Sequence, residues 1–124
     1  MQPFNGRLVA LGGQPVYVRI DNGGDLRRGV AVLGLTDFHG WFALKTHFFS
    51  VPGYSGPIHV RVKRIDRSGV ARLGNAATDG STFSASTVGD QPVFTWMRGP
   101  GCYEWDISER GFHEAVVVRA TAHD

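Results

Sequence analysis

The stretch Ile58-His59-Val60-Arg61-Val62-Lys63-Arg64-Ile65 alternates apolar and polar side chains along most of its length. Successive side chains of a β-strand point to opposite faces of the sheet. The stretch therefore predicts a half-buried strand over 58–65. Its apolar side chains face a core, and His59, Arg61 and Lys63 face outward.

The chain on both sides of this strand is divided into short segments by seventeen glycines and six prolines. These segments are rich in Val, Ile, Phe, Tyr and Thr, and such spacing is typical of a sandwich or barrel. A long Gly- and Ser-rich loop is expected over 75–91, with a short edge strand near 82–86. The other expected strands cover 7–11, 16–20, 29–35, 70–73, 93–97, 102–107 and 112–121.

The segment 37–51 fits two patterns. Several of its aromatic residues recur at helical spacing, whereas the alternation from Phe42 to Phe48 fits a strand. Gly40 disfavours a helix interior, and the neighbouring segments have β-type composition. We interpret 37–51 as a strand.

The segment Gly99-Pro100-Gly101-Cys102-Tyr103-Glu104-Trp105 resembles the corner that leads into the sixth strand of an immunoglobulin-type sandwich. Tyr103 would be the corner tyrosine whose hydroxyl bonds to the upstream backbone, and Trp105 would replace a half-cystine. Cys102 is the only cysteine, so no intrachain disulfide forms, and we expect it to be a small buried residue. The predicted fold is all-β, an antiparallel immunoglobulin-like β-sandwich of about seven to nine strands in one domain spanning 1–124.

Three further pieces of sequence carry a second resemblance: Pro52-Gly53-Tyr54-Ser55-Gly56-Pro57, Gly101-Cys102-Tyr103 and Val116-Val117-Val118. Over roughly the last 75 residues, the chain resembles C-terminal β-sandwich domains of uncharacterised bacterial secreted proteins and lipoproteins. The resemblance implies the fold and a cell-envelope setting. It carries over no catalytic residues, because those domains have no assigned activity.

Charge and hydropathy exclude some classes of protein. Thirteen Lys and Arg against eleven Asp and Glu give a net charge of +2, which is not the basic footprint of a dedicated nucleic-acid binder. No apolar run reaches the roughly 18 residues that span a bilayer. The first seven residues lack signal-peptide character. We expect a secreted or cell-envelope protein if a leader has been removed, and a cytoplasmic one otherwise.

Two pairs of charged residues have the side-chain types of catalytic groups. If 108–111 is a four-residue hairpin loop, Asp106 lies directly opposite His113, and both side chains share the outer face. Glu104 and Asp106 share a strand face at a spacing of roughly 6–7 Å, which overlaps that of glycosidase acid pairs. A flat, solvated strand lacks the cleft that such enzymes need, so we interpret both pairs as surface pairs.

The sequence contains no recognisable cofactor or metal motif. A blue-copper site would need His and Met soon after Cys102, and neither is there. There is no nucleophile elbow and no phosphate-binding glycine loop before a helix. The five histidines are scattered along the chain, at His39, His47, His59, His113 and His123. We therefore expect no enzymatic activity, no cofactor and no bound metal.

The remaining hypothesis is a non-catalytic binding or assembly module that docks on another protein through a sheet face or an edge strand. The aromatic segment 41–51 motivates it, because a strand that is apolar on both faces needs a cover. The candidate partner-binding residues are His59, Arg61, Lys63, Trp41, Phe49 and Tyr54. The alternative is a small-barrel binder of nucleic acid or another polyanion that uses the row His59, Arg61 and Lys63, with Arg98 beside Trp96 for stacking. Carbohydrate binding by loop-tip aromatics is a third possibility, without support from a particular residue.

Overall fold

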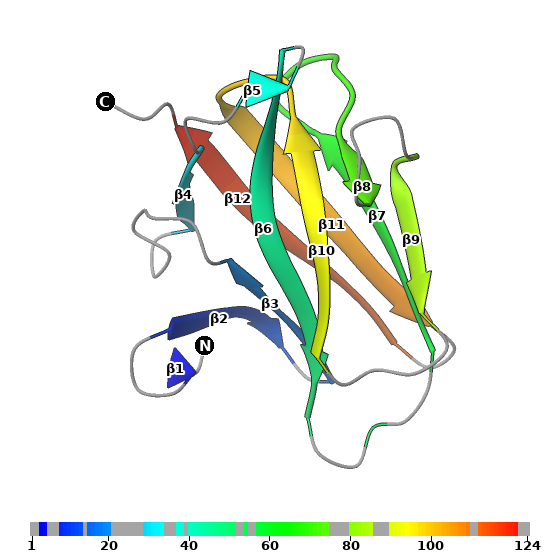
Figure 1. Cartoon of the computed structure of the whole chain (residues 1–124). Coiled ribbons are helices and arrows are strands. Elements are labelled where there is room, and N and C mark those ends of the chain that lie inside the picture. The colour runs from blue at the N-terminus through cyan, green and yellow to red at the C-terminus, as the bar shows by residue number, and fades with distance from the viewer. Residues whose placement is uncertain are drawn as a thin grey trace.

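All the regular structure described in this chain is β-strand, and it forms two sheets (Figure 1). The computed structural model describes residues 3–4, 8–13, 15–20, 29–33, 37–38, 40–51, 54, 57–74, 80–85, 90–109 and 112–121. Within these ranges, no helix is long and apolar enough to cross a membrane.

The seven-stranded sheet faces the viewer in Figure 1. Its strands are antiparallel to their neighbours, and β6 and β10 lie at its centre. In spatial order it contains β1 (Pro3–Phe4), β2 (Leu8–Gly13), β3 (Val16–Ile20), β6 (Trp41–Ser50), β10 (Asp90–Met97) and β8 (Arg72–Gly74), with β5 (Asp37–Phe38) paired to β6.

The five-stranded sheet lies behind it, and it is mixed because β4 runs parallel to β12. Its other pairs are antiparallel. In spatial order it contains β4 (Val30–Val32), β12 (Phe112–Thr121), β11 (Gly101–Glu109), β7 (Ile58–Arg64) and β9 (Thr82–Ala85).

The two sheets pack face to face over one hydrophobic core, which makes the fold a β-sandwich. Alternate residues of β7, β11 and β12 enter this core, and Trp105, Tyr103 and Phe48 are the largest side chains that are fully buried in it. Removal of this apolar surface from water is the main force that holds the sheets together. The core includes no disulfide, because Cys102 is a free thiol.

Several predicted elements are confirmed. The alternation in β7 places Ile58, Val60 and Val62 in the core and leaves the side chains between them exposed. The ambiguous segment 37–51 forms the strands β5 and β6, joined at Gly40, whose φ of 84° suits a turn. The short edge strand predicted near 82–86 is β9. The rest of the 75–91 loop falls largely outside the described residues.

Three predictions need correction. The described residues form twelve strands, more than the expected seven to nine, because short pieces such as β1, β4 and β5 pair at the margins. Cys102 is half-buried and not a core residue, since the inward positions of β11 belong to Tyr103 and Trp105. The β11–β12 pairing sets Ser108 opposite His113, so Asp106 faces Ala115 and not His113.

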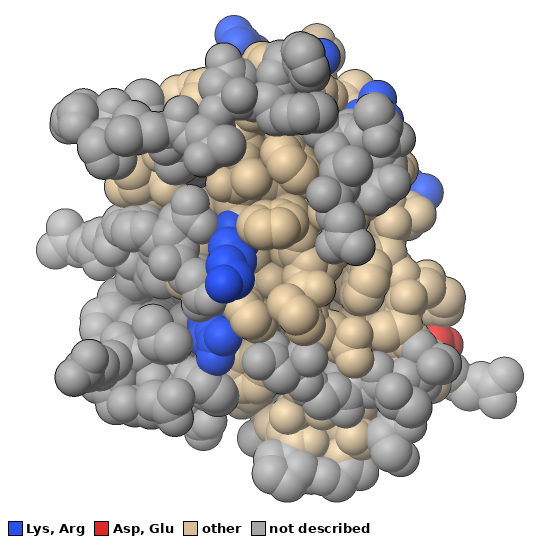
Figure 2. All heavy atoms as spheres, in the orientation of Figure 1, with Lys and Arg blue, Asp and Glu red and all other residues tan. Residues whose placement is uncertain are grey.

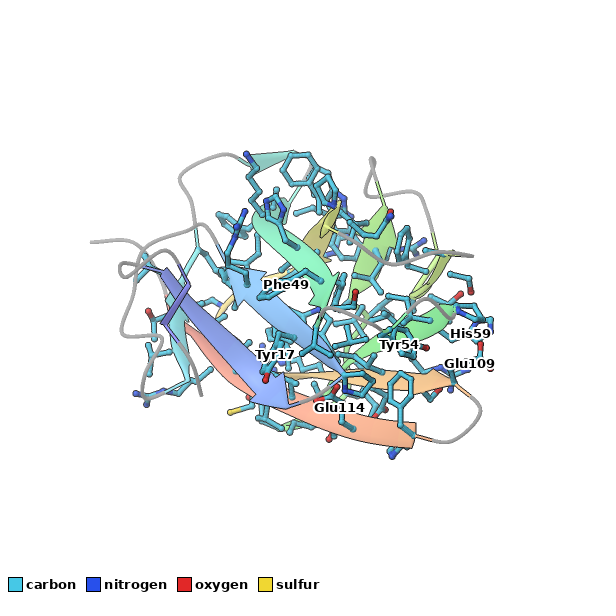
Figure 3. The ribbon with its side chains drawn as sticks, turned by 90° about the horizontal axis from the view of Figure 1, so that it is seen from below. Tyr17, Phe49, Tyr54, His59, Glu109 and Glu114 are labelled. Carbon is cyan, nitrogen blue, oxygen red and sulfur yellow. The ribbon has the colours of Figure 1, made fainter. Side chains whose placement is uncertain are left out.

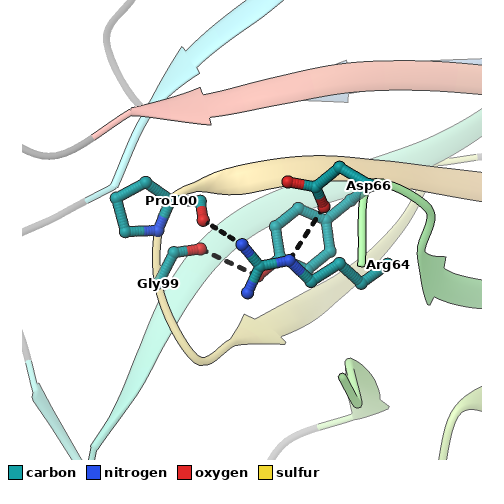
Figure 4. Close-up of polar contacts among 5 residues, drawn as sticks. Arg64, Asp66, Gly99 and Pro100 are labelled. Atoms are coloured by element: carbon teal, nitrogen blue, oxygen red, sulfur yellow. Dashed lines mark hydrogen bonds and ion pairs between the residues drawn. The ribbon is translucent and has the colours of Figure 1, made fainter. Parts of the chain in front are cut away.

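The predicted corner before β11 is present as a hydrogen bond (Figure 4). The Tyr103 hydroxyl donates to the Gly99 carbonyl at 2.8 Å. Arg64 closes the corner from β7: it donates to Asp66 at 2.9 Å and to the Pro100 carbonyl at 2.5 Å, and it lies 5.6 Å from the centre of the Tyr103 ring. The hydrogen bond from Arg64 lowers the pKa of Asp66.

A chain of buried hydrogen bonds connects the two sheets inside the core. Trp105 Nε1 of β11 donates to Thr95 Oγ1 of β10 at 3.1 Å. The Thr46 hydroxyl donates to the Val93 carbonyl. Since a hydroxyl has a single proton, Thr46 Oγ1 accepts from Thr95 Oγ1, 3.0 Å away. Each donor in this chain therefore has an acceptor, as burial of polar groups requires.

Candidate functional site

The residues predicted to bind a partner lie at three separate places. His59, Arg61 and Lys63 lie on the outer face of the five-stranded sheet. Trp41 and Phe49 belong to β6 in the other sheet, and Tyr54 lies beyond its end. Figure 3 looks at one end of the sandwich and shows His59 and Glu109 together on one side, away from Tyr17 and Phe49. The six residues therefore do not form one surface.

The outer face of the five-stranded sheet contains an open hollow of about 480 Å³. We call it the polar hollow. Side chains from four adjacent strands line it, and most of them are polar: His59 and Arg61 of β7, Thr82 and Ser84 of β9, Asp106 and Ser108 of β11, and His113 of β12, together with Val60.

The basic row on β7 is matched by acidic residues on the neighbouring strand. Lys63 Nζ lies 3.3 Å from Glu104 and 3.6 Å from Asp106. Asp106 also lies 3.6 Å from His113 Nε2. Asp106 and His113 thus share the outer face as predicted, because the register differs from the predicted one by an even number of residues. Cation and carboxylate alternate here, so the row does not present a continuous positive surface.

His59 lies between a hydroxyl and a carboxylate. Its Nδ1 is 2.6 Å from Ser84 Oγ on β9, and its Nε2 is 3.2 Å from Glu109 Oε2 on β11. The imidazole therefore bridges the edge strand β9 and the central strand β11. A hydroxyl, an imidazole and a carboxylate in this order are the groups that activate a nucleophile in acyl-transfer sites.

The outer face of the seven-stranded sheet carries a second hydrophobic cluster, separate from the core. Trp41 of β6 and Trp96 of β10 are its centre, with only 8% and 9% of their surfaces exposed. The guanidinium groups of Arg98 and Arg72 lie 4.2 Å and 5.4 Å from the centre of the Trp41 ring. Trp96 Nε1 also donates to the Gly74 carbonyl at 3.1 Å. Trp41 is therefore mostly covered.

Phe94 extends this cluster to the surface. Its ring centre is 5.9 Å from that of Trp96, and 38% of its surface is exposed. A second hollow, of about 150 Å³, lies beside it and is lined by Lys45, Pro92, Val93 and Phe94. We call the group Trp41, Phe94, Trp96, Arg72 and Arg98, together with this hollow, the aromatic face. Phe49 lies further along β6, where its ring stacks on Tyr17 at 5.6 Å.

Tyr54 supports the end of the sandwich. Its hydroxyl donates to the Pro57 carbonyl at 2.6 Å, and its ring packs edge-on against Phe112. Partial burial, and then the negative charge of Glu109, raise the pKa of its phenol. These contacts assign Tyr54 a structural role between the loop after β6 and the start of β12.

The described residues contain no group of three or more His, Cys, Asp or Glu with the spacing to hold a metal ion. His47 lies on β6, opposite Arg19 and Pro92, whereas His59 and His113 belong to the other sheet. His39 and His123 fall outside the described residues.

Sequence reasoning missed Ser84, Glu109 and Phe94. The alternation of β10 places Phe94 on the face opposite Val93, so its exposure follows once the inward set is known. Nothing in the sequence brings Ser84 or Glu109 to His59, since both contacts depend on pairing between distant strands.

The comparisons with known proteins give no relative. No family model, no curated protein and no solved structure matches this chain.

Proposed function

We propose that this chain is an immunoglobulin-like module that docks on another protein through the aromatic face. The observation that carries the proposal is the Trp41–Trp96 cluster outside the core, which continues into the exposed ring of Phe94. The outer face of a sandwich strand is ordinarily polar. A cluster of Trp, Phe and Arg at this position has the composition of an interface centre.

The strand order supports the immunoglobulin-like part of the proposal. The order β3-β6-β10-β8 corresponds to strands A, B, E and D of an immunoglobulin constant domain, and β7-β11-β12 corresponds to C, F and G. These seven strands also follow one another in the required sequence order. The Tyr103 corner lies at the start of the F-like strand, and Trp105 would correspond to the half-cystine of that strand. The strands β1, β2, β4, β5 and β9 are additions to that plan.

The hollow beside Phe94 indicates what the partner presents. A volume of about 150 Å³ accommodates one aromatic ring or branched aliphatic side chain. Among the side chains described on β3, β6, β8 and β10, three are Lys or Arg and none is Asp or Glu, and Arg98 follows directly after β10. Figure 2 shows Lys and Arg over the middle of this face and, among the residues that it colours, an acidic one only at the edge of the view. The complementary surface is an apolar anchor surrounded by carboxylates.

The polyanion alternative gains no support from the geometry. Lys63 lies between two carboxylates, and Arg98 is on the opposite sheet from the row His59, Arg61 and Lys63. These four residues therefore do not form one basic track along which a nucleic-acid backbone would lie.

A charge placed at the centre of the aromatic face tests the docking proposal. A Phe94→Asp variant buries a carboxylate in the interface, so we expect at least a tenfold loss of partner binding. The partner is first identified by photo-crosslinking from native extract, with a benzophenone amino acid in place of Phe94. Its affinity for the wild type and the variants is then measured with purified components by calorimetry.

Val117→Asp is the matched control, because Val117 is 48% exposed on the outer face of the other sheet. We expect this variant to bind like the wild type and both variants to keep the circular dichroism spectrum of the wild type. The proposal is wrong if Phe94→Asp binds normally, or if light scattering and crosslinking find only a monomer without a partner.

A further inference from the structure

We propose that Ser84, His59 and Glu109 form an acyl-transfer site at the edge of the polar hollow, with Ser84 as the nucleophile toward small esters. This inference goes beyond the docking proposal and does not depend on it, because the polar hollow and the aromatic face belong to different sheets. It also puts the expectation of no enzymatic activity to a direct test.

The distances match those of an activated serine. Ser84 Oγ and His59 Nδ1 are 2.6 Å apart, which is a full hydrogen bond. His59 Nε2 and Glu109 Oε2 are 3.2 Å apart. A nucleophile within hydrogen-bond reach of a base, and a third group that orients the base, are the signature of such sites.

The carboxylate also selects the tautomer that this chemistry needs. An ionised Glu109 only accepts hydrogen bonds, so the proton of a neutral His59 ring lies on Nε2. Nδ1 is then an acceptor, and the Ser84 hydroxyl donates to it. The serine proton therefore already points at the base that would take it.

Strand pairing holds the three residues in place. His59 is directly opposite Ser84 on β9 and opposite Ser108 on β11, and Glu109 follows Ser108. Directly before β9, the Val62 N–H donates to the Ser81 carbonyl. Val62 and Ser81 are therefore a hydrogen-bonded pair, whose backbone groups point toward each other. By alternation, 59 and 84 form a non-hydrogen-bonded pair, in which side chains approach most closely.

The same alternation gives a donor for the developing oxyanion. In a non-hydrogen-bonded pair the Ser84 N–H points away from β7, toward the outer edge of β9. The N–H of the nucleophilic serine is one of the oxyanion donors in serine proteases. The polar hollow, open and about 480 Å³ in volume, leaves room for a small acyl group beside Ser84.

The reaction balances without a cofactor. Ser84 Oγ adds to the ester carbonyl while its proton passes to His59 Nδ1. The tetrahedral intermediate expels the alkoxide, which leaves as the alcohol with that proton, and the acyl group remains on Ser84. Water then adds to the acyl carbonyl, gives a proton to His59 and releases the acid, and Ser84 Oγ recovers the proton from the imidazolium.

A fluorophosphonate probe tests the nucleophile in the full chain. The probe phosphonylates an activated serine with loss of fluoride, and peptide mass spectrometry locates the adduct. We expect modification at Ser84 and slow turnover of p-nitrophenyl acetate. We expect Ser84→Ala to abolish both, and His59→Gln to reduce the rate about a hundredfold, since a general base contributes about 10²–10⁴-fold.

Ser68→Ala is the matched control. Ser68 is an exposed serine in the turn after β7, and it does not line the polar hollow. Its replacement is expected to leave labelling and turnover unchanged. Ser68, Ser84 and His59 are all exposed, so the variants are expected to keep the wild-type fold by circular dichroism.

Glu109 is a positioning residue, because it acts on the reaction by orienting the His59 ring. Its test therefore measures the tautomer of His59, which a merely structural role would not change. Nitrogen-resolved NMR of the His59 ring is expected to find the proton of the neutral imidazole on Nε2. Glu109→Ala is expected to move the ring toward a mixture of both tautomers and to slow labelling in parallel.

Two results would overturn the proposal. One is a folded wild-type protein whose Ser84 stays unmodified by the probe. The other is turnover that persists in Ser84→Ala. Neither outcome concerns binding through Phe94. The acyl-transfer proposal and the docking proposal can therefore be disproved independently.

Discussion

The Tyr103 hydroxyl is a polar group in the sandwich core, and its hydrogen bond to Gly99 is what makes burial of that group tolerable. A Tyr103→Phe variant leaves the Gly99 carbonyl, which is also buried, without this donor. We expect a loss of about 1–2 kcal/mol in the free energy of unfolding. Urea titration at neutral pH measures the loss, as a lower midpoint with an unchanged slope.

Tyr54→Phe is the control for this change, because it removes the same hydroxyl from an exposed hydrogen bond. Water can replace that bond, so the expected loss is below about 0.5 kcal/mol. Equal losses in the two variants would mean that the corner hydrogen bond is not a special source of stability.

The same hydroxyl makes stability depend on alkaline pH. Burial raises the pKa of Tyr103 above its ordinary value of 10.0, and the nearby Arg64 cation partly opposes this. The folded pKa is therefore above the unfolded one, so the stabilisation is complete below pH 10 and is lost as the pH rises through the folded pKa. In a Tyr54→Phe background, we expect Tyr103→Phe to flatten the decline in unfolding free energy above about pH 10.

At the level of strands, the sequence predicts the faces well and the register poorly. The alternation in Ile58–Ile65 separates inward from outward residues correctly, because burial acts on each residue in turn. A four-residue hairpin loop at 108–111 predicts that Asp106 is opposite His113, but Ser108 pairs with His113. A shift of this kind keeps every side chain on its own face, so hydrophobic pattern alone does not distinguish the two registers.

The turn between β5 and β6 depends on Gly40. Its φ of 84° is costly for any residue with a Cβ atom, by about 1–2 kcal/mol. A Cβ would also lie 2.7 Å from an Arg98 nitrogen, so the guanidinium would have to move from its position over Trp41. We therefore expect Gly40→Ala to lose about 1–2 kcal/mol of stability in urea titration and to alter the near-ultraviolet dichroism of the tryptophans.

Gly80→Ala is the matched control. Gly80 is outside the left-handed region, and a Cβ there meets no atom within 4 Å. We expect a change within about 0.5 kcal/mol. If Gly80→Ala costs as much as Gly40→Ala, neither the turn nor the contact with Arg98 explains the loss.

At the level of the whole molecule, the candidate sites divide between the two sheets in a way that the sequence does not reveal. Alternation tells whether a side chain faces the core or the solvent, but it does not tell to which of the two sheets the strand belongs. His59 and Trp41 are both predicted to bind a partner, yet they lie on opposite sides of the sandwich. The sheet to which a strand belongs depends on pairing between distant segments, such as β6 with β10, and that pairing is set by the folded chain as a whole.

The charges follow the same division. Carboxylates of β11 accompany the cations of β7 on the five-stranded sheet, whereas the described strands of the aromatic face carry basic side chains among aromatic ones. A small net charge of +2 thus conceals two surfaces of different character. For this reason the small net charge argues against a polyanion binder but indicates neither the polar hollow nor the aromatic face.

The two sheets are joined by the hydrogen bond from Trp105 to Thr95, and a double-mutant cycle measures its contribution. Thr95→Val leaves the buried indole N–H without an acceptor, so we expect a loss of about 1–3 kcal/mol. Trp105→Phe removes the donor and creates a cavity, with an expected loss of at least about 2 kcal/mol. In the Trp105→Phe background no N–H remains to be satisfied, so Thr95→Val should cost about 1–2 kcal/mol less than in the wild type.

Urea titration followed by circular dichroism gives the four free energies. Additive losses would contradict this account and would leave apolar packing alone to hold the sheets together.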